Sequence, residues 1–177
     1  MILVLDFGGQ YAHIIARRVR ELGVYSDVRP CDMSLVEIGK IRPDGIVLSG
    51  GPSSVYEHNA PLMNKKVLDL KIPLLGICYG EQLIGKFVGG TVLAGKLKEF
   101  GKKDLIVKKT GKLLKGLSRR EQVWMSHGDL VAELPKDFEI LASTDTCRIA
   151  AFENEKRKIY GIQFNAEVAH TPSGMQI

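Results

Sequence analysis

The sequence predicts an α/β fold built on one open sheet, mixed but mostly parallel, with helices on both faces. Three observations lead to this prediction. Short apolar runs alternate with segments of helical periodicity over residues 1–90, and glycine or proline bounds most of the runs. Beyond residue 90 the pattern changes to short strands with few helical signals between them, which is typical of antiparallel pairing. Because no linker or internal repeat interrupts the chain, we expect a single domain over residues 1–177.

The first strand is predicted at residues 2–5, where an apolar run ends. A helix over 11–22 follows, because its apolar residues form one stripe and Gly23 can end it. Ser34 and Glu37 have capping-box spacing for a short second helix. The other elements predicted in this half are strands at 24–28, 45–49 and 72–77 and helices at 61–70 and 79–88. The strands predicted after residue 90 lie at 91–94, 104–108, 121–125, 138–143, 147–152 and 159–164.

The composition argues against several classes of protein. The net charge of +5 is modest, and the lysines of 96–120 and 156–158 have no interleaved aromatic residues, so no nucleic-acid partner is expected. These lysines form either a solvated basic face or a docking surface for an acidic partner. The N-terminal apolar run is too short for a signal peptide, and no run approaches the roughly 18 apolar residues of a membrane span.

The cysteine content indicates a reducing compartment. Cys31, Cys78 and Cys147 are too few and too far apart for a disulfide framework, and they lack the paired spacing of a zinc site. We therefore expect a cytoplasmic protein with no metal centre and no membrane partner.

Cys78 stands between a predicted strand and a predicted helix, with Gly76 and Gly80 two residues to either side. This spacing is the cysteine form of a nucleophile elbow, in which a strained turn exposes the nucleophile at the edge of a sheet. The start of the following helix would favour the thiolate, and the backbone N–H of Tyr79 would face a tetrahedral oxyanion. The alternative is that Cys78 is a small core residue, which is the usual fate of a single cysteine.

A second glycine turn, at residues 50–52, follows the preceding predicted strand. In a doubly wound sheet the ends of adjacent strands converge, so a glycine amide here could complete the oxyanion site beside Cys78. An ordinary turn at the end of a strand would give the same local pattern.

Taken together, these motifs resemble the class I glutamine amidotransferases. The marks are residues 76–82 (GICYGEQ), residues 49–52 (SGGP) and a glutamate motif near the C-terminus. Within the family, the chain is similar to the branch that supplies ammonia for amination of the purine nucleotide XMP. The segments that carry this closer likeness are 6–11, 48–56, 123–129, 147–151, 160–164 and 167–171.

The resemblance implies hydrolysis of the glutamine side-chain amide to glutamate and ammonia through a thioester on Cys78. Gly51 and Tyr79 would hold the oxyanion, and Glu167 would orient the catalytic base. The resemblance also implies residues that bind the amino-acid end of glutamine, namely Gln82, Ser126, His127, Gly128 and Asp129. A synthetase with ATP pyrophosphatase activity, as a subunit or a further domain, would use the ammonia together with ATP and magnesium. No cofactor is expected in the glutaminase domain itself.

The sequence departs from the family at the base. Asn165 and Ala166 stand where the family has histidine and proline before Glu167, and an asparagine cannot take up a proton near neutral pH. General acid–base catalysis is worth about 10²- to 10⁴-fold, so we expect glutamine hydrolysis to be weak or absent. Rescue by another histidine would require a ring nitrogen within about 3 Å of the sulfur. His127 and His170 are the candidates, while His13 and His58 have no motif support, and a structural or surface role is favoured for each.

Two milder departures accompany it. Glu81 occupies a position where related sequences often have methionine, which indicates a changed contact and not lost chemistry. Family members usually continue into a last helix beyond the segment that ends this sequence, and we expect that helix to be missing here.

Three functions follow from these observations. The first is an amidotransferase glutaminase weakened at Asn165, of this branch or of another class I amidotransferase. The second is a non-catalytic regulatory subunit that binds glutamine. The third is a nucleotide-binding flavodoxin-like module, which has little support because Gly8 and Gly9 do not form a dinucleotide fingerprint.

Overall fold

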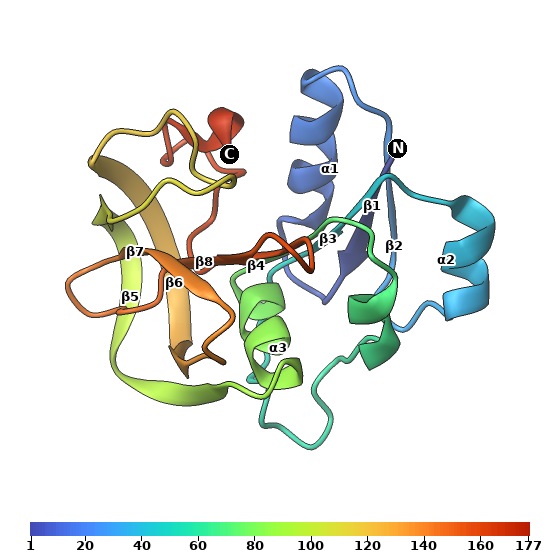
Figure 1. Cartoon of the computed structure of the whole chain (residues 1–177), viewed down its shortest axis with the longest axis horizontal. Helices are drawn as coiled ribbons and strands as arrows, with labels where there is room; N and C mark the ends of the chain where they lie inside the picture. The colour runs from blue at the N-terminus through green and yellow to red at the C-terminus, as the bar shows by residue number, and fades with distance from the viewer.

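One nine-stranded sheet runs through the molecule, with strands in the order β2-β1-β3-β4-β9-β8-β7-β5-β6 (Figure 1). The computed structural model describes the backbone of residues 1–177 and the side chains of all of them except residues 96 and 97. Neighbouring strands are parallel from β2 to β9 and antiparallel from β9 to β6. The open mixed sheet expected from the sequence is confirmed.

The parallel part contains the elements that alternate along the first half of the chain. Its strands are β1 (Ile2–Asp6), β2 (Ser26–Pro30), β3 (Gly45–Leu48), β4 (Leu74–Ile77) and, from the end of the chain, β9 (Ile159–Ile162). Its helices are α1 (Ala12–Glu21), α2 (Leu35–Ile41) and α3 (Tyr79–Phe87). The predicted stop after α1 is confirmed, because Gly23 has a positive φ of 81° and its N–H bonds the Arg20 carbonyl. The predicted capping box of Ser34 and Glu37 is also present.

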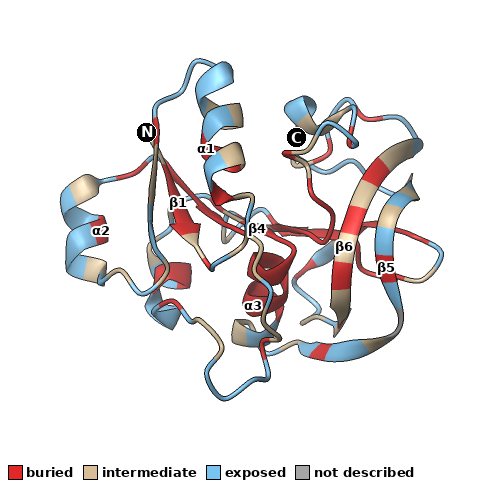
Figure 2. Cartoon of the chain, turned by 180° about the vertical axis from the view of Figure 1, so that it is seen from behind, coloured by how far each residue is buried: buried red, intermediate tan, exposed pale blue. Residues whose placement is uncertain are grey.

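Helices cover both faces of this part, because successive side chains of β1 point to opposite faces and pack against different helices. Leu3 and Leu5 pack into one core with residues of α2 and α3, while Val4 packs into a second core with residues of α1. Figure 2 shows that α3 is buried along most of its length, whereas α2 is largely exposed at the outer edge. The helix that follows Cys78 is therefore held firmly in the middle of the protein.

The antiparallel part is dominated by one long pair, β5 (Thr91–Val107) and β6 (Arg120–Glu133). The prediction of separate strands at 91–94 and 104–108 was wrong, because charged residues and a glycine between them also pair with β6, so that one strand spans both ranges. β6 likewise extends well beyond the predicted 121–125. β7 (Glu139–Ser143) and β8 (Ala151–Asn154) connect this pair to β9. β8 begins later than the predicted 147–152, since Cys147 lies in the turn before it.

The predicted helix at 61–70 is replaced by a short 3₁₀ helix at Lys65–Asp69. The Asn64 side chain accepts a hydrogen bond from the Lys66 N–H, which caps the helix and keeps the preceding residues outside it. A second 3₁₀ turn, Gly174–Gln176, lies near the end of the chain. Among the described residues, no helix has the length and apolar character needed to cross a membrane.

Candidate active site

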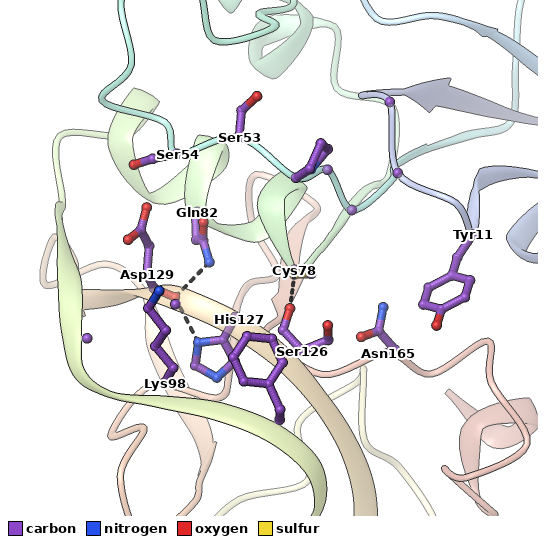
Figure 3. Close-up of a pocket in the computed structure, with 18 of the residues that line it drawn as sticks. Tyr11, Ser53, Ser54, Cys78, Gln82, Lys98, Ser126, His127, Asp129 and Asn165 are labelled. Atoms are coloured by element: carbon purple, nitrogen blue, oxygen red, sulfur yellow. Dashed lines mark hydrogen bonds between the residues drawn. The ribbon is translucent and has the colours of Figure 1, made fainter.

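A cavity of about 630 Å³ opens where the carboxyl ends of β1, β3 and β4 face the long β5–β6 pair. Loops after the three parallel strands form one wall, as expected for ligand sites in open α/β sheets. β5 and β6 form the opposite wall. The residues that line it include Cys78, Gln82, Ser126, His127, Asp129 and Asn165, all labelled in Figure 3. Its size suits a small molecule such as an amino acid.

Cys78 occupies the strained turn that the sequence predicts. Its φ of 53° and ψ of −109° lie outside the regions that residues other than glycine usually adopt. A Cβ on Gly76 would lie 2.5 Å from the Gly80 carbonyl oxygen, and one on Gly80 would lie 2.6 Å from the Leu48 carbonyl oxygen. Both flanking glycines are therefore required by close backbone packing, and Cys78 faces the cavity.

The glycine turn after β3 lies against the nucleophile. A Cβ on Gly50 would be 3.6 Å from the Cys78 Cβ, and one on Gly51 would be 2.7 Å from the Phe7 carbonyl oxygen. The Tyr79 side chain points elsewhere, since its hydroxyl donates to the Pro61 carbonyl at 2.6 Å. Gly51 lines the cavity together with Cys78, whereas Tyr79 does not, and the oxyanion role of the two amides stays a prediction.

The sulfur is held as a neutral thiol. Burial is the main cause that raises the pKa of Cys78 to about 12, although the Tyr79 N–H acts in the opposite direction. The thiol donates to the Ser126 carbonyl oxygen at 3.6 Å. The expected bias of the helix start toward thiolate is thus outweighed by burial.

Asn165 is held firmly at the position where a base is expected. Its backbone N–H donates to the Trp124 carbonyl at 2.9 Å, and its carbonyl accepts from the Thr171 hydroxyl at 2.6 Å. Its side-chain Nδ2 donates to Glu167 Oε1 at 2.8 Å. Burial raises the pKa of Glu167, which lies behind Asn165 and outside the cavity lining. Asn165 therefore makes the contact to Glu167 that an imidazole N–H would make.

One face of Asn165 is left without a partner. Its Oδ1 and the second carboxylate oxygen of Glu167 accept no hydrogen bond from any described residue, and both are buried. A buried polar atom without a partner costs about 1–3 kcal/mol. Asn165 lines the cavity, but its amide cannot carry a proton.

The remaining predicted residues form the far end of the cavity. Gln82 Nε2 donates to the Asp129 carbonyl at 2.8 Å and to Gln163 Oε1 at 3.0 Å. Ser126, His127, Gly128 and Asp129 follow one another along β6 and all line the cavity. The structure thus brings every predicted site residue to the cavity except Tyr79 and Glu167, which support it from behind.

No other histidine reaches the sulfur as a base. His127 Nδ1 lies 2.8 Å from the Asp129 carbonyl oxygen and Nε2 lies 2.9 Å from Glu99 Oε2, so both ring nitrogens are occupied. The His170 ring stacks on Trp124, with 4.5 Å between centroids, and is not part of the cavity lining. The structural roles favoured for these two histidines agree with the geometry.

Lys98 and Glu99 adjoin the site from β5, and no sequence pattern indicated either of them. Lys98 lines the cavity and its hydrocarbon stem passes over Gly128. Glu99 is 2% exposed and lies with His127 and Cys147, whose possible ligand atoms are within 4.8 Å of one another. Each of these three side chains is engaged in hydrogen bonds, so a hydrogen-bond network accounts for the cluster. Because Glu99 stands in a lysine-rich segment, its sequence context indicates an exposed side chain. Its burial depends on partners that are distant in the sequence.

Comparison with known proteins agrees with this geometry. The profile of the family described as Glutamine amidotransferase class-I matches residues 3–177. The chain is 51% identical over its whole length to a GMP synthase [glutamine-hydrolyzing] from Caldicellulosiruptor saccharolyticus and 47% identical to one from Clostridium perfringens. It spans 35% of the length of each of these relatives.

Solved structures give the same picture. A GMP synthase subunit from Thermoplasma acidophilum superposes with a TM-score of 0.87 at 37% identity, over 98% of this chain and 87% of that one. A glutamine amidotransferase from Thermotoga maritima has a TM-score of 0.75 at 24% identity, over 94% of this chain and 76% of that one, and supports the fold alone.

Proposed function

Because this chain belongs to the class I glutamine amidotransferases, we propose that it is the glutaminase part of a GMP synthetase, weakened by Asn165. The observation that carries the proposal is the strained turn that presents Cys78 to the cavity between Gly51 and the Asn165–Glu167 pair. The similarity to GMP synthases over the whole chain supports the choice of this branch. A glutaminase of another class I amidotransferase is the alternative.

The chemistry follows from the positions of these groups. The Cys78 sulfur attacks the side-chain amide carbon of glutamine, and the resulting oxyanion is held by the Gly51 and Tyr79 amides. The carbon–nitrogen bond then breaks, ammonia leaves, and a glutamyl thioester remains for hydrolysis by water. The thiol proton must pass to the leaving nitrogen, and that transfer needs a base beside the sulfur. Asn165 cannot serve, so the reaction starts from a thiol whose pKa is about 12.

The cavity also supports recognition of the substrate. Gln82, Ser126, His127, Gly128 and Asp129, which all line the cavity, would hold the amino-acid end of glutamine. The ammonia would pass to a synthetase subunit or domain that uses ATP and magnesium to activate XMP. Relatives nearly three times as long as this chain leave room for such a part. The glutaminase itself would need no cofactor, and the cytoplasmic location expected from the sequence stays a prediction.

Restoring the base tests this proposal. Ammonia release from glutamine would be measured for this chain and for Asn165→His, each with the synthetase part of a relative, ATP, magnesium and XMP. We expect a gain of at least about 100-fold for Asn165→His, since general acid–base catalysis contributes 10²- to 10⁴-fold. Asn165→Gln, which also lacks a titratable ring, should show no gain. If Asn165→His binds glutamine but gains nothing, the assignment of residue 165 to the base position is wrong.

A non-catalytic glutamine-binding role is the second candidate. It is favoured by Asn165, whose amide cannot carry a proton, and by the Cys78 thiol, whose pKa burial raises to about 12. This role predicts saturable binding of glutamine without covalent change. Intact-mass measurement after incubation with glutamine separates the two, because a glutamyl adduct on Cys78 would exclude pure binding.

A further inference from the structure

Glu99 of β5 is a buried acid with a complete set of hydrogen-bond partners beside the cavity. Its Oε1 accepts hydrogen bonds from the hydroxyls of Thr144, at 2.8 Å, and Thr146. Its Oε2 lies 2.9 Å from His127 Nε2, and the Lys103 ammonium is 3.9 Å from Oε1. Oε2 has no other partner than His127 among the described residues.

The ring of His127 faces an acceptor at each nitrogen. The Asp129 carbonyl oxygen can only accept, so Nδ1 must donate to it. Nε2 faces the Glu99 carboxylate, which also accepts. A hydrogen bond from each ring nitrogen would satisfy both of these acceptors.

His127 connects Glu99 to the substrate wall of the cavity. The Asp129 carbonyl receives a hydrogen bond from His127 on one side and from Gln82 Nε2, at 2.8 Å, on the other. Gln82 also bonds Gln163, two residues before Asn165. Between His127 and the nucleophile, the Ser126 carbonyl accepts the Cys78 thiol. One continuous network thus links β5, β6 and α3 around the cavity.

The strand pairing shows how Glu99 reaches this position. β5 and β6 change register between Ala94, which is opposite Asp129, and Glu99, which is opposite His127. Irregular pairing of this kind re-aims side chains and is common next to active sites. After it, Glu99 points inward at 2% exposure while Phe100 points outward at 63%. The irregularity therefore brings Glu99 opposite His127, where regular pairing from Ala94 would bring a residue three positions earlier in the chain.

We propose that Glu99 is a positioning residue for the glutamine site, which holds the segment from Ser126 to Asp129 in place through a hydrogen bond to His127. This inference rests on the proposed function for its substrate. It requires no contact between Glu99 and glutamine, because Glu99 acts on the backbone that faces both the substrate and the sulfur. A misplacement of such groups by about 1 Å can cost about 100-fold.

Glu99→Gln is the direct test, because the amide keeps the size of the side chain but replaces the hydrogen bond between the ring and a carboxylate oxygen by a weaker, neutral one. Glu153→Gln is the matched control. Glu153 is another buried carboxylate, 4% exposed, but its partners are the backbone N–H groups of Lys112 and Leu113, remote from the cavity. Both variants replace a buried charge by an amide, so loss of stability alone would affect them alike. Melting temperatures of both would be recorded.

Glutamine affinity is the first readout, measured by titration calorimetry on the full chain. We expect Glu99→Gln to bind glutamine about 10- to 100-fold more weakly and Glu153→Gln to stay within about twofold of the parent. Equal affinities for the parent and Glu99→Gln would overturn the inference. A similar loss in both variants would overturn it too, since that would show a general effect of stability.

The alkylation rate of Cys78 is the second readout and does not depend on glutamine. Because the Ser126 carbonyl accepts a hydrogen bond from the Cys78 thiol, loosening the segment from Ser126 to Asp129 should raise the rate of Cys78 alkylation by iodoacetamide about threefold or more. Peptide mass mapping would follow the alkylation of Cys78. The control should leave the rate unchanged. If the parent does not bind glutamine, the proposed function fails. The alkylation rate then decides the role of Glu99 alone, and an unchanged rate in Glu99→Gln refutes it.

Nitrogen NMR supplies a signature that a purely structural role would not change. Long-range ¹H–¹⁵N spectra of the parent should show protons on both ring nitrogens of His127. In Glu99→Gln the amide can donate to Nε2, so that nitrogen should become unprotonated while Nδ1 keeps its proton. A His127 ring with the same protonation in both proteins would contradict the proposal.

Discussion

The turn at Cys78 and the segment at Asn165 form two sides of one site, and they differ in what they retain. At Cys78 the backbone is strained, and the flanking glycines pack so closely that no side chain fits. At Asn165 the backbone is equally well anchored, by Trp124 and Thr171, but the side chain cannot carry a proton. The shape of a catalytic site can therefore persist without the group that moves its protons.

The strongest effect is expected at the turn around Cys78. Gly80→Ala would place a Cβ 2.6 Å from both the Cβ and the carbonyl oxygen of Leu48, so we expect a loss of about 3 kcal/mol or more in free energy of unfolding, or no folding. Gly39→Ala in α2 is the control, because nothing lies within 4 Å of its added Cβ, and it should gain about 0.5–1 kcal/mol. Urea denaturation of both variants tests this. A harmless Gly80→Ala would mean that the turn is looser than the packing indicates.

The next effect concerns the segment at Asn165. Asn165→His would place a cation beside the sulfur and should lower the pKa of Cys78 from about 12. A fall of about two pKa units corresponds to about 100-fold more thiolate at pH 8. The pH dependence of iodoacetamide alkylation at Cys78, compared with the parent and with Asn165→Gln, measures the shift. Identical profiles for the three proteins would place residue 165 out of reach of the sulfur.

Glu81 offers a third test, because it lies in the first turn of α3 directly after the nucleophile. Both carboxylate oxygens are buried without a hydrogen-bond partner among the described residues, and burial raises the pKa of Glu81 well above its ordinary value of 4.5. Glu81→Met removes the acid with little change in volume. We expect a gain of about 1–3 kcal/mol in free energy of unfolding at pH 8.

The pH dependence of the free energy of unfolding tests independently whether the buried Glu81 carboxyl destabilises the fold. Above pH 4.5 the unfolded chain loses the Glu81 proton while the folded protein keeps it, so the folded state binds more protons. The contribution of Glu81 to stability therefore falls as the pH rises through that window. Glu81→Met should flatten this decline between about pH 5 and pH 8, whereas the exposed Glu155→Met should not, in denaturation curves at several pH values. A slope unchanged by Glu81→Met would show that this carboxyl is solvated.

The weakest effect is expected far from both sides of the site. Ser34→Ala removes the hydroxyl that caps α2, with a loss of about 1 kcal/mol in stability. Ser34→Thr should recover most of it. Glutamine affinity should be the same in all three proteins, by calorimetry. A change in affinity would mean that α2 influences the cavity despite its place at the outer edge of the sheet.

Local patterns predicted most of the parallel part because each signal there acts within a few residues. The apolar runs of β1, β3 and β4 and the stop at Gly23 are of this kind. The strain at Cys78 was also predictable, since the glycine spacing is itself local.

What could not be predicted depends on distant partners. Glu99 is buried by His127 and Thr144, which are 28 and 45 residues away, and nothing near it in the chain indicates this. The continuous β5 was missed because its register with β6 changes between Ala94 and Glu99, and this change interrupts the alternation of residues that marks a strand. The shortened helix at Lys65–Asp69 depended on the cap at Asn64, which the apolar pattern of the segment concealed.

The proton retained on Cys78 has a consequence for oxidation. Peroxide reacts with thiolates, and a cysteine with a pKa of about 12 has very little thiolate at physiological pH. A working nucleophile of this type is exposed to conversion into sulfenic acid, whereas this sulfur is shielded by its own protonation. Burial, which keeps the proton on Cys78, should thus make this cysteine slow to react with peroxide.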